Sequence, residues 1–257
     1  MPPHFAASLP PIVEAYLDEI TGRFEAILGA KLAGLYLHGS AVQGDYQPDR
    51  SDLDVFGLVS SPLSEIERDR LIAQLSHSTL PVPAVGLELT VCRSDVAQAP
   101  VLAYPLEFAL STGAIWGAQV EALGTCSDLV IHAELCRQQG RALVGPPPAE
   151  CFAPTPRHRL RSAVIAELRW HQDNLSQKAA PLWDANAVLN AARSVYAADA
   201  GRIVSKTQGG ERWLDRHPAE DLVAEALSRR SGARTEPLGK EEVRAFLDRS
   251  IALIERM

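Results

Sequence analysis

The first half of the chain mixes two hydrophobic periods. Apolar residues three or four positions apart indicate amphipathic helices, and short apolar runs, some with alternating polar positions, indicate strands. The segment from 95 to 110 fits neither pattern well, because Pro100 and Pro105 interrupt it. The predicted helices cover residues 11–28, 62–76 and 128–138, and the predicted strands cover residues 35–38, 52–59, 85–91 and 142–145. We expect a mixed sheet covered by helices.

The second half is predicted to be helical throughout. Prolines 146–148, 154 and 156 cannot continue regular structure and mark a domain boundary. We therefore expect an α+β protein, with an α/β domain over residues 1–156 and an all-α helical bundle over residues 157–257. A cleft between two such domains is the default ligand site. Helical spacing is found over residues 157–178, 184–200, 207–216, 219–230 and 240–256.

Composition narrows the functional classes. The 257 residues are 46% apolar and 22% charged, which is ordinary for a globular protein. The N-terminus has no signal-peptide pattern, and no segment has the ~20 uninterrupted apolar residues of a membrane span. The four scattered cysteines form no C-x-x-C pair, which is typical of reduced thiols in a cytoplasmic protein. The net charge of −7 argues against nucleic acid as a partner and is compatible with a cationic small molecule.

Candidate chemistry lies where two of the predicted strands meet a turn. The strand over 35–38 ends at Gly39-Ser40, and the strand over 52–59 begins with Asp52 and Asp54. Side chains two residues apart on a strand point to the same face, so both carboxylates can bind one Mg²⁺ together with substrate phosphate oxygens. The backbone N–H groups of a Gly-Ser turn can hold a triphosphate. Two solvated aspartates after an ordinary turn are the alternative.

Gly39-Ser40, followed after eleven residues by Asp52-x-Asp54, resembles the signature of the polymerase-β-like nucleotidyltransferase superfamily. The whole chain resembles one branch, the aminoglycoside adenylyltransferases that modify streptomycin and spectinomycin. Compared with their usual spacing, this chain has one extra loop residue within 47–50, which leaves the strand parity intact. The resemblance implies an N-terminal nucleotidyltransferase domain, a helical second domain, ATP as co-substrate and two Mg²⁺ ions.

Glu88 lies in the middle of the strand predicted over 85–91. A lone glutamate there is often an exposed edge residue. If this strand lies beside that of Asp52 and Asp54, Glu88 completes a cluster of three metal-binding carboxylates. The resembling family has a glutamate on the corresponding strand, where it acts as general base on the drug hydroxyl. The resemblance therefore assigns Glu88 as the catalytic base.

The resemblance also implies contacts to ATP. Gly39 and Ser40 are expected to hold phosphate oxygens, with Ser51 assisting. Residues 188–206 resemble the signature of the family's second domain, in which Arg193 and Lys206 match an arginine and a lysine that contact the ATP phosphates. Cationic groups of this kind stabilise a leaving pyrophosphate.

One nucleotide contact has an alternative, and one is missing. Asp128 matches an aspartate that contacts the nucleotide in the family, but an aspartate also suits a helix N-terminus without any ligand. The family often has a tyrosine that borders the adenine near the position of residues 229–230, and no tyrosine stands there in this chain. Phosphate recognition is therefore better supported than adenine recognition.

Residues that would contact a cationic drug are carboxylates and an aromatic wall. The candidates are Trp116, Trp170, Trp183, Asp184 and Asn186, since the segment before residue 188 lines the cleft in the family. The family's acidic residue and histidine align only loosely here, with Trp183 or Asp184 and with Asn186. Tryptophans at helical spacing are also common core residues.

The predicted function is Mg²⁺-dependent transfer of AMP from ATP to a hydroxyl of an aminoglycoside or aminocyclitol antibiotic by a monomeric resistance enzyme. A nucleotidyltransferase of the toxin–antitoxin type, which modifies a protein, is one alternative, although such proteins are usually single small domains. A non-catalytic nucleotide sensor is the other, although it would have no reason to retain three carboxylates. No G-x-x-x-x-G-K-[ST], H-E-x-x-H or G-x-S-x-G motif supports another reaction class.

Overall fold

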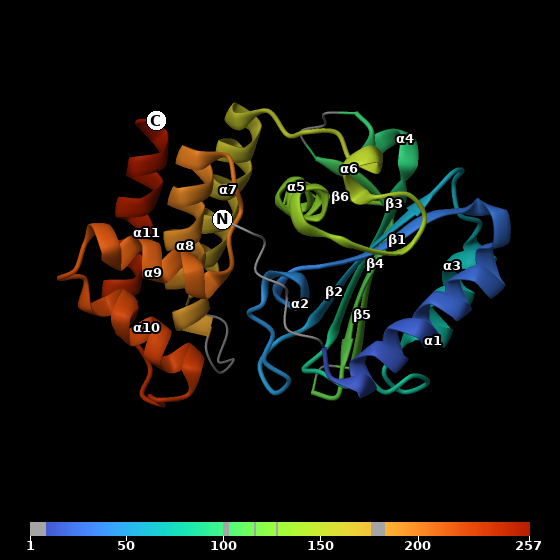
Figure 1. The fold of residues 1–257 in the computed structure, drawn as a ribbon, viewed down its shortest axis with the longest axis horizontal. Helices are drawn as coiled ribbons and strands as arrows, with labels where there is room; N and C mark the ends of the chain where they lie inside the picture. The colour runs from blue at the N-terminus through green and yellow to red at the C-terminus, as the bar shows by residue number, and fades with distance from the viewer. Residues whose placement is uncertain (1–8, 100–102, 116, 127, 176–182) are drawn as a thin grey trace. The chain divides into compact units, whose positions relative to one another are not determined.

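The computed structural model describes residues 9–99, 103–115, 117–126, 128–175 and 183–257. The chain divides into two compact units, Met1–Pro154 and Thr155–Met257 (Figure 1). The first unit is built on a sheet, and the described part of the second contains only helices. The predicted α+β fold, with a mixed sheet followed by a helical half, is thus confirmed.

The sheet of the first unit is mixed. Its strand order is β5-β4-β3-β2-β1-β7, with β6 paired to β4 away from this path. β2 and β3 pair in parallel, and the other neighbours pair antiparallel. The strands are β1 (Leu32–His38), β2 (Leu53–Val59), β3 (Leu87–Arg93), β4 (Tyr104–Gly113), β5 (Gly117–Ala122), β6 (Thr125–Cys126) and β7 (Arg141–Val144).

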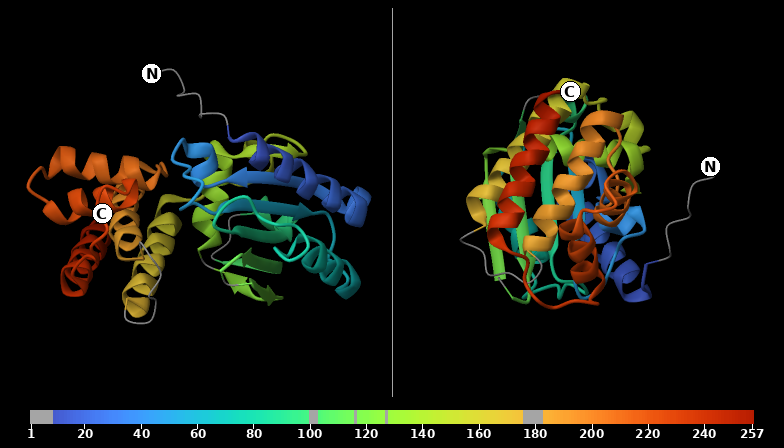
Figure 2. Two further views of the ribbon diagram at one scale, coloured as in Figure 1. Left: turned by 90° about the horizontal axis from the view of Figure 1, so that it is seen from below. Right: turned by 90° about the vertical axis from the view of Figure 1, so that its left-hand side faces the viewer.

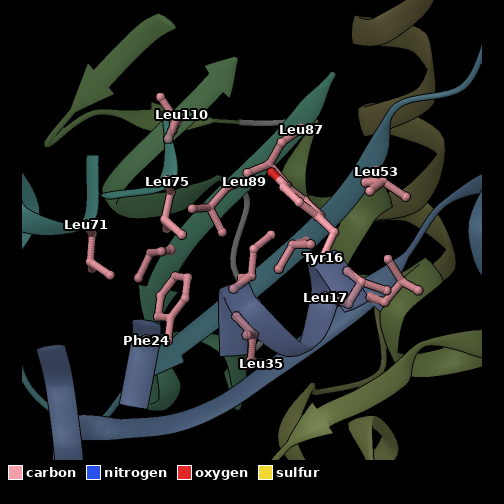
Figure 3. Close-up of a cluster of buried hydrophobic side chains, with 14 of the residues drawn as sticks. Tyr16, Leu17, Phe24, Leu35, Leu53, Leu71, Leu75, Leu87, Leu89 and Leu110 are labelled. Atoms are coloured by element: carbon pink, nitrogen blue, oxygen red, sulfur yellow. The ribbon is translucent and has the colours of Figure 1, made fainter. Parts of the chain in front are cut away.

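One face of the sheet packs against two helices, α1 (Pro11–Leu28) and α3 (Glu65–Leu75). Odd-numbered positions of β1, β2 and β3 point into this core, among them Leu35 and Leu89 (Figure 3). Phe24 of α1 is fully buried against them. The buried spacing along α1 is that of an amphipathic helix, which is why the sequence predicts this helix with its observed bounds.

The opposite face of the sheet is covered by α5 (Leu129–Gln139) and α6 (Pro148–Cys151), as Figure 1 shows. Tyr36 and Phe56 on this face contact Phe152 edge-to-face, with ring centroids 5.4 and 5.1 Å apart. Because side chains alternate along a strand, the even-numbered positions of β1, β2 and β3 all belong to this second face. The candidate carboxylates are even-numbered, so they lie on the α5 side.

Some elements differ from the sequence prediction. The helix predicted over 62–76 begins at Glu65, because Ser64 and Glu67 form a capping box at its N-terminus. Strands β4, β5 and β6 were not predicted. Pro105 is tolerated near the start of β4, where the partner strand is the two-residue β6. β5 lies at the edge of the sheet with all six residues exposed, so it carries no apolar alternation.

The described helices of the second unit pack around α8, which contacts each of the other four. The approach of α9 to α8 is close, since a Cβ on Gly209 would lie 2.5 Å from Cβ of Arg193. Two views of these helices are given in Figure 2. They are α7 (Arg157–Asn174), α8 (Trp183–Ala200), α9 (Lys206–Arg216), α10 (Asp221–Ser231) and α11 (Lys240–Glu255). Across the described residues, no helix has the length and apolar character needed to cross a membrane.

The connections between the main elements of the first unit contain further short helices. They are η1 (Gly29–Lys31), α2 (Ser40–Gln43) and α4 (Ser94–Ala97). Among them, α2 bears directly on the candidate site, because it follows β1 and contacts both β1 and β2.

Candidate active site

The Gly39-Ser40 turn is pressed against Asp54. Gly39 has φ 67° and ψ −149°, a conformation that is essentially restricted to glycine. A Cβ at this position would lie 1.8 Å from Oδ2 of Asp54. Both the backbone conformation and the available space therefore require glycine here. The turn and the carboxylate form one compact structure, with Ser40 as the first residue of α2.

Asp54 and Glu88 lie directly opposite each other. They are register partners in the parallel pair β2·β3, whose strands are about 4.8 Å apart as in any sheet. Both side chains therefore rise from the same face of the sheet, as expected if the two strands are neighbours. Asp52 comes one residue before β2 and shares the parity of Asp54. Glu88 is exposed, whereas Asp52 and Asp54 are half-buried.

Two histidines join Asp54 at this end of the sheet. His38 is the last residue of β1 and pairs with Asp54 in the antiparallel register, and His132 comes from α5. One potential ligand atom from each of these three residues lies within 4.8 Å of the other two. Among the described residues, His38, Asp54 and His132 are the group whose potential ligand atoms all lie within this distance of one another. The group does not include Asp52 or Glu88.

His38 is buried, and this burial governs its charge. Burial, followed by the neighbouring His132, holds the pKa of His38 well below its usual value, so the imidazole is neutral at pH 7. The two rings are nearly perpendicular, with centroids 5.3 Å apart. Neither histidine was predicted from the sequence to be a site residue. His38 directly precedes Gly39, so its position in the sequence could have indicated a role in the site. No local feature of the sequence indicates such a role for His132, which the packing of α5 brings to the site.

The donor set fits a hard divalent cation. The carboxylates of Asp54 and Glu88 rise from one face of the sheet, and Asp52 lies two residues before Asp54 in the chain. Mg²⁺ prefers such oxygens together with substrate phosphates. Gly39 is packed directly against Asp54, so the Asp54 carboxylate lies beside the turn that would hold phosphate. The residues present therefore fit Mg²⁺, and the three assignments stay predictions.

The loop before β2 forms a turn around Gln47. The backbone N–H groups of Arg50 and Ser51 both donate to the carbonyl of Gln47, at 3.0 and 2.8 Å. The Ser51 hydroxyl accepts a hydrogen bond from the Gln47 N–H at 3.0 Å. The loop with the extra residue is thus closed by its own hydrogen bonds. The predicted contact of Ser51 with phosphate would use a hydroxyl that already holds this turn.

Asp128 directly precedes α5, and its carboxylate does not cap the helix. Its Oδ1 lies 2.6 Å from Sγ of Cys126. Burial, followed by the hydrogen bond to this carboxylate, raises the pKa of the Cys126 thiol to about 12. The Asp128 side chain is therefore oriented by the thiol rather than by the helix, and its predicted contact with the nucleotide remains a prediction.

The predicted phosphate-binding cations belong to the second unit. Arg193 of α8 lies 3.7 Å from the Glu167 carboxylate of α7, and both side chains are mostly buried. Lys206 is the first residue of α9, after the N-cap Ser205, whose hydroxyl accepts the N–H of Gln208 at 3.1 Å. Both positions are set by helix packing within this unit, and their roles stay predictions.

Trp183 belongs to an aromatic cluster of the second unit. Its ring centroid lies 5.2 Å from that of Trp170 and 5.3 Å from that of His171. Nε2 of His171 is 2.8 Å from Nδ2 of Asn190. Trp183 is half-buried, as is Asn186 further along α8. Trp116, the other tryptophan predicted to contact the drug, lies outside the described residues.

Asp184 holds together three parts of the second unit. Its carboxylate accepts the backbone N–H of Leu238 at 2.6 Å and that of Ala185 at 2.7 Å. It also pairs with the buried Arg229 at 3.2 Å, and Arg229 in turn donates to backbone carbonyls of the loop before α11. A contact of Asp184 with a drug would compete with these bonds. Arg229 and its neighbour Arg230 are both buried where the family's tyrosine is missing.

We expect Asp184→Ala to destabilise the protein strongly. Removing this carboxylate leaves the mostly buried Arg229 guanidinium without its ion pair, which costs about 3 kcal/mol. Thermal and urea unfolding followed by circular dichroism would measure the loss. Asp173→Ala, on the same unit, is the control for a carboxylate without this network. Unchanged stability combined with a raised KM for a drug would instead favour the direct drug contact.

Comparisons with known proteins follow the same division of the chain. A model of the nucleotidyltransferase domain matches residues 17–95, and a model of the aminoglycoside adenylyltransferase C-terminal domain matches residues 150–252. An aminoglycoside (3'') (9) adenylyltransferase from Escherichia coli is 29% identical over 245 residues, which cover 90% of this chain and 88% of that protein. One from Klebsiella pneumoniae is 29% identical, covering 81% of this chain and 80% of that protein.

A solved structure shares the fold. The crystal structure of a spectinomycin adenyltransferase from Enterococcus faecialis, with ATP and spectinomycin, superposes with a TM-score of 0.73. The match covers 95% of this chain and 99% of that chain, at 19% sequence identity. Since the two family models match residues 17–95 and 150–252 and the two relatives cover 81–90% of the chain, the chain belongs to the aminoglycoside adenylyltransferase family and is an adenylyltransferase.

Proposed function

We propose that this protein transfers AMP from ATP, with Mg²⁺, to a hydroxyl of an aminoglycoside or aminocyclitol such as streptomycin or spectinomycin, and thereby confers resistance. The observation that carries the proposal is the register of Asp54 opposite Glu88, beside a glycine turn that contacts Asp54. This register supports the proposal, because the candidate metal-binding carboxylate, the candidate base and the candidate phosphate-binding turn are then neighbours. We also propose that the nucleotidyltransferase domain ends at residue 156 and that the helical domain begins at residue 157.

The candidate residues have the following roles in the proposed reaction. Mg²⁺ held by Asp52, Asp54 and Glu88 would supply charge neutralisation for the triphosphate. The Gly39-Ser40 turn would bind phosphate oxygens through its N–H groups and hydroxyl. Glu88, the exposed carboxylate of the three, accepts the proton of the acceptor hydroxyl.

The transfer itself forms one bond and breaks one. The acceptor oxygen attacks the α-phosphorus in line, the bond from this phosphorus to the bridging oxygen breaks, and pyrophosphate leaves with that oxygen. We assign Arg193 and Lys206 to the negative charge that develops on the leaving pyrophosphate. Ser51 and Asp128 are proposed as further nucleotide contacts.

Two facts support a cationic antibiotic as acceptor. Both curated relatives described above are named for activity on aminoglycosides. The net charge of −7 also favours the approach of a polycationic molecule. For the drug we propose contacts from Trp116, Trp183, Asp184 and Asn186.

The acceptor can be identified by pyrophosphate release. The full-length protein with Mg-ATP is assayed against streptomycin, spectinomycin, other aminoglycosides and no drug. We expect release with one of the first two compounds, together with an AMP adduct on the drug in mass spectrometry. No release with any drug would contradict the proposed acceptor, and AMP attached to a co-incubated protein would favour a protein target.

A further inference from the structure

We infer that His38, Asp54 and His132 form a binding site for a divalent cation that prefers imidazole ligands, of which Zn²⁺ is the representative. This site is distinct in chemistry from the proposed Mg²⁺ site and shares one ligand, Asp54, with it. The inference rests on the proposed function only through this shared carboxylate.

Three different elements build the site. His38 ends β1, Asp54 is its direct register partner on β2, and His132 lies on α5, which covers this face of the sheet. Their potential ligand atoms lie within 4.8 Å of one another. In a tetrahedral zinc site, with bonds of about 2.0–2.3 Å, ligand atoms are roughly 3.3 Å apart. The three ligand atoms would therefore move closer together when they bind an ion in this geometry.

The donor set selects the class of metal. Two imidazoles and one carboxylate, with one position open to water, are typical of sites that hold Zn²⁺, whereas Mg²⁺ prefers oxygen ligands. Divalent ions later in the first transition row bind such nitrogen ligands more tightly. In the described residues, Nδ1 of His38 is buried and accepts or donates no hydrogen bond. A metal ion bound through this nitrogen would satisfy it.

Asp54 lies beside both the turn and His38. Its carboxylate occupies the space that a Cβ on Gly39 would fill, and the β1·β2 pairing places it opposite His38. An ion bound between Asp54 and the histidines would occupy a carboxylate that the Mg-ATP complex needs. We therefore expect Zn²⁺ to inhibit Mg²⁺-dependent transfer and excess Mg²⁺ to relieve the inhibition.

Binding is tested by calorimetry on the metal-free, full-length protein, titrated with Zn²⁺ without ATP or Mg²⁺. We expect one tight site whose affinity falls more than about tenfold in His132→Gln, since loss of an outer-shell partner alone commonly costs that much. His158→Gln, which changes an exposed histidine of α7, is the matched control and should bind as the unmodified protein does. Equal Zn²⁺ affinity in His132→Gln and the unmodified protein would overturn the inference.

Co²⁺ gives an independent readout of the ligands. Its visible spectrum should show nitrogen and oxygen ligation, and this spectrum should be lost in His132→Gln and in His38→Gln. Sulfur-to-cobalt charge-transfer absorption would place the ion on a cysteine and contradict the site. Unfolding curves of both variants establish that the native fold is retained, and His132→Gln alone decides if His38→Gln does not fold.

Glu88→Gln separates this inference from the proposed function. The variant removes the proposed base but none of the three ligands, so we expect it to keep Zn²⁺ binding while losing transfer. Loss of Zn²⁺ binding in Glu88→Gln would move the ion to the carboxylates and overturn the inference. Full transfer activity in the same variant would contradict the proposed base and leave the histidine site standing.

Discussion

Glu88→Gln is expected to lower the rate of AMP transfer about 10²- to 10⁴-fold, which is the usual contribution of a general base. The amide cannot accept the proton of the acceptor hydroxyl, although it keeps the size of the carboxylate. Because Glu88 is exposed at the sheet surface, we expect no loss of stability. ATP binding should be largely retained, since the phosphate turn and Asp54 are unchanged.

Pyrophosphate release and calorimetric titration with Mg-ATP would test this prediction together. Asp52→Asn is the matched carboxylate variant, for which we expect weaker Mg²⁺-dependent ATP binding rather than a purely kinetic defect. A kcat for Glu88→Gln within twofold of the unmodified enzyme would rule out this residue as the base.

Gly39→Ala is expected to reduce transfer about 100-fold or more. A Cβ would come within 1.8 Å of Oδ2 of Asp54, so either the turn or the carboxylate must move. The backbone conformation of Gly39 adds about 1–3 kcal/mol of strain for any other residue. Since misplacement of a reacting group by about 1 Å can cost 10²-fold, the displaced carboxylate should affect both metal binding and rate.

Gly44→Ala provides the control for backbone strain alone. Gly44 follows α2, at the opposite end of this helix from Gly39, and also has a positive φ, of 70°, but a Cβ there would have no atom within 4 Å. Both variants should lose stability in thermal unfolding, by about 1–2 kcal/mol for Gly44→Ala. Only Gly39→Ala should lose activity. Equal activity in the two variants would show that the contact with Asp54 has no functional consequence.

Local sequence was sufficient for much of the fold. α1 and the helices of the second unit are marked by apolar spacing alone, because burial of one helix face requires that period. The exposed edge strand β5 buries no face, so its pairing with β4 leaves no periodic signal. Whether a segment pairs at a sheet edge depends on a neighbouring strand, which local pattern does not encode.

For the site, the sequence determined which residues share a face and the tertiary structure decided which residues meet. The parity of Asp52 and Asp54 follows from the covalent geometry of a strand and needs no knowledge of the fold. The pairing of Asp54 with Glu88 required β2 and β3 to be neighbours, which the sequence could only pose as a condition.

Two contacts were decided by packing alone. His132 reaches Asp54 only because α5 covers that face of the sheet. Asp184, predicted from the sequence to contact a drug, pairs with Arg229, 45 residues further along the chain. Residues so far apart in sequence have no local relation that could predict their contact. Local sequence pattern thus predicted the candidate carboxylates and their shared face, whereas their neighbours in space depend on the tertiary structure, because long-range packing sets them.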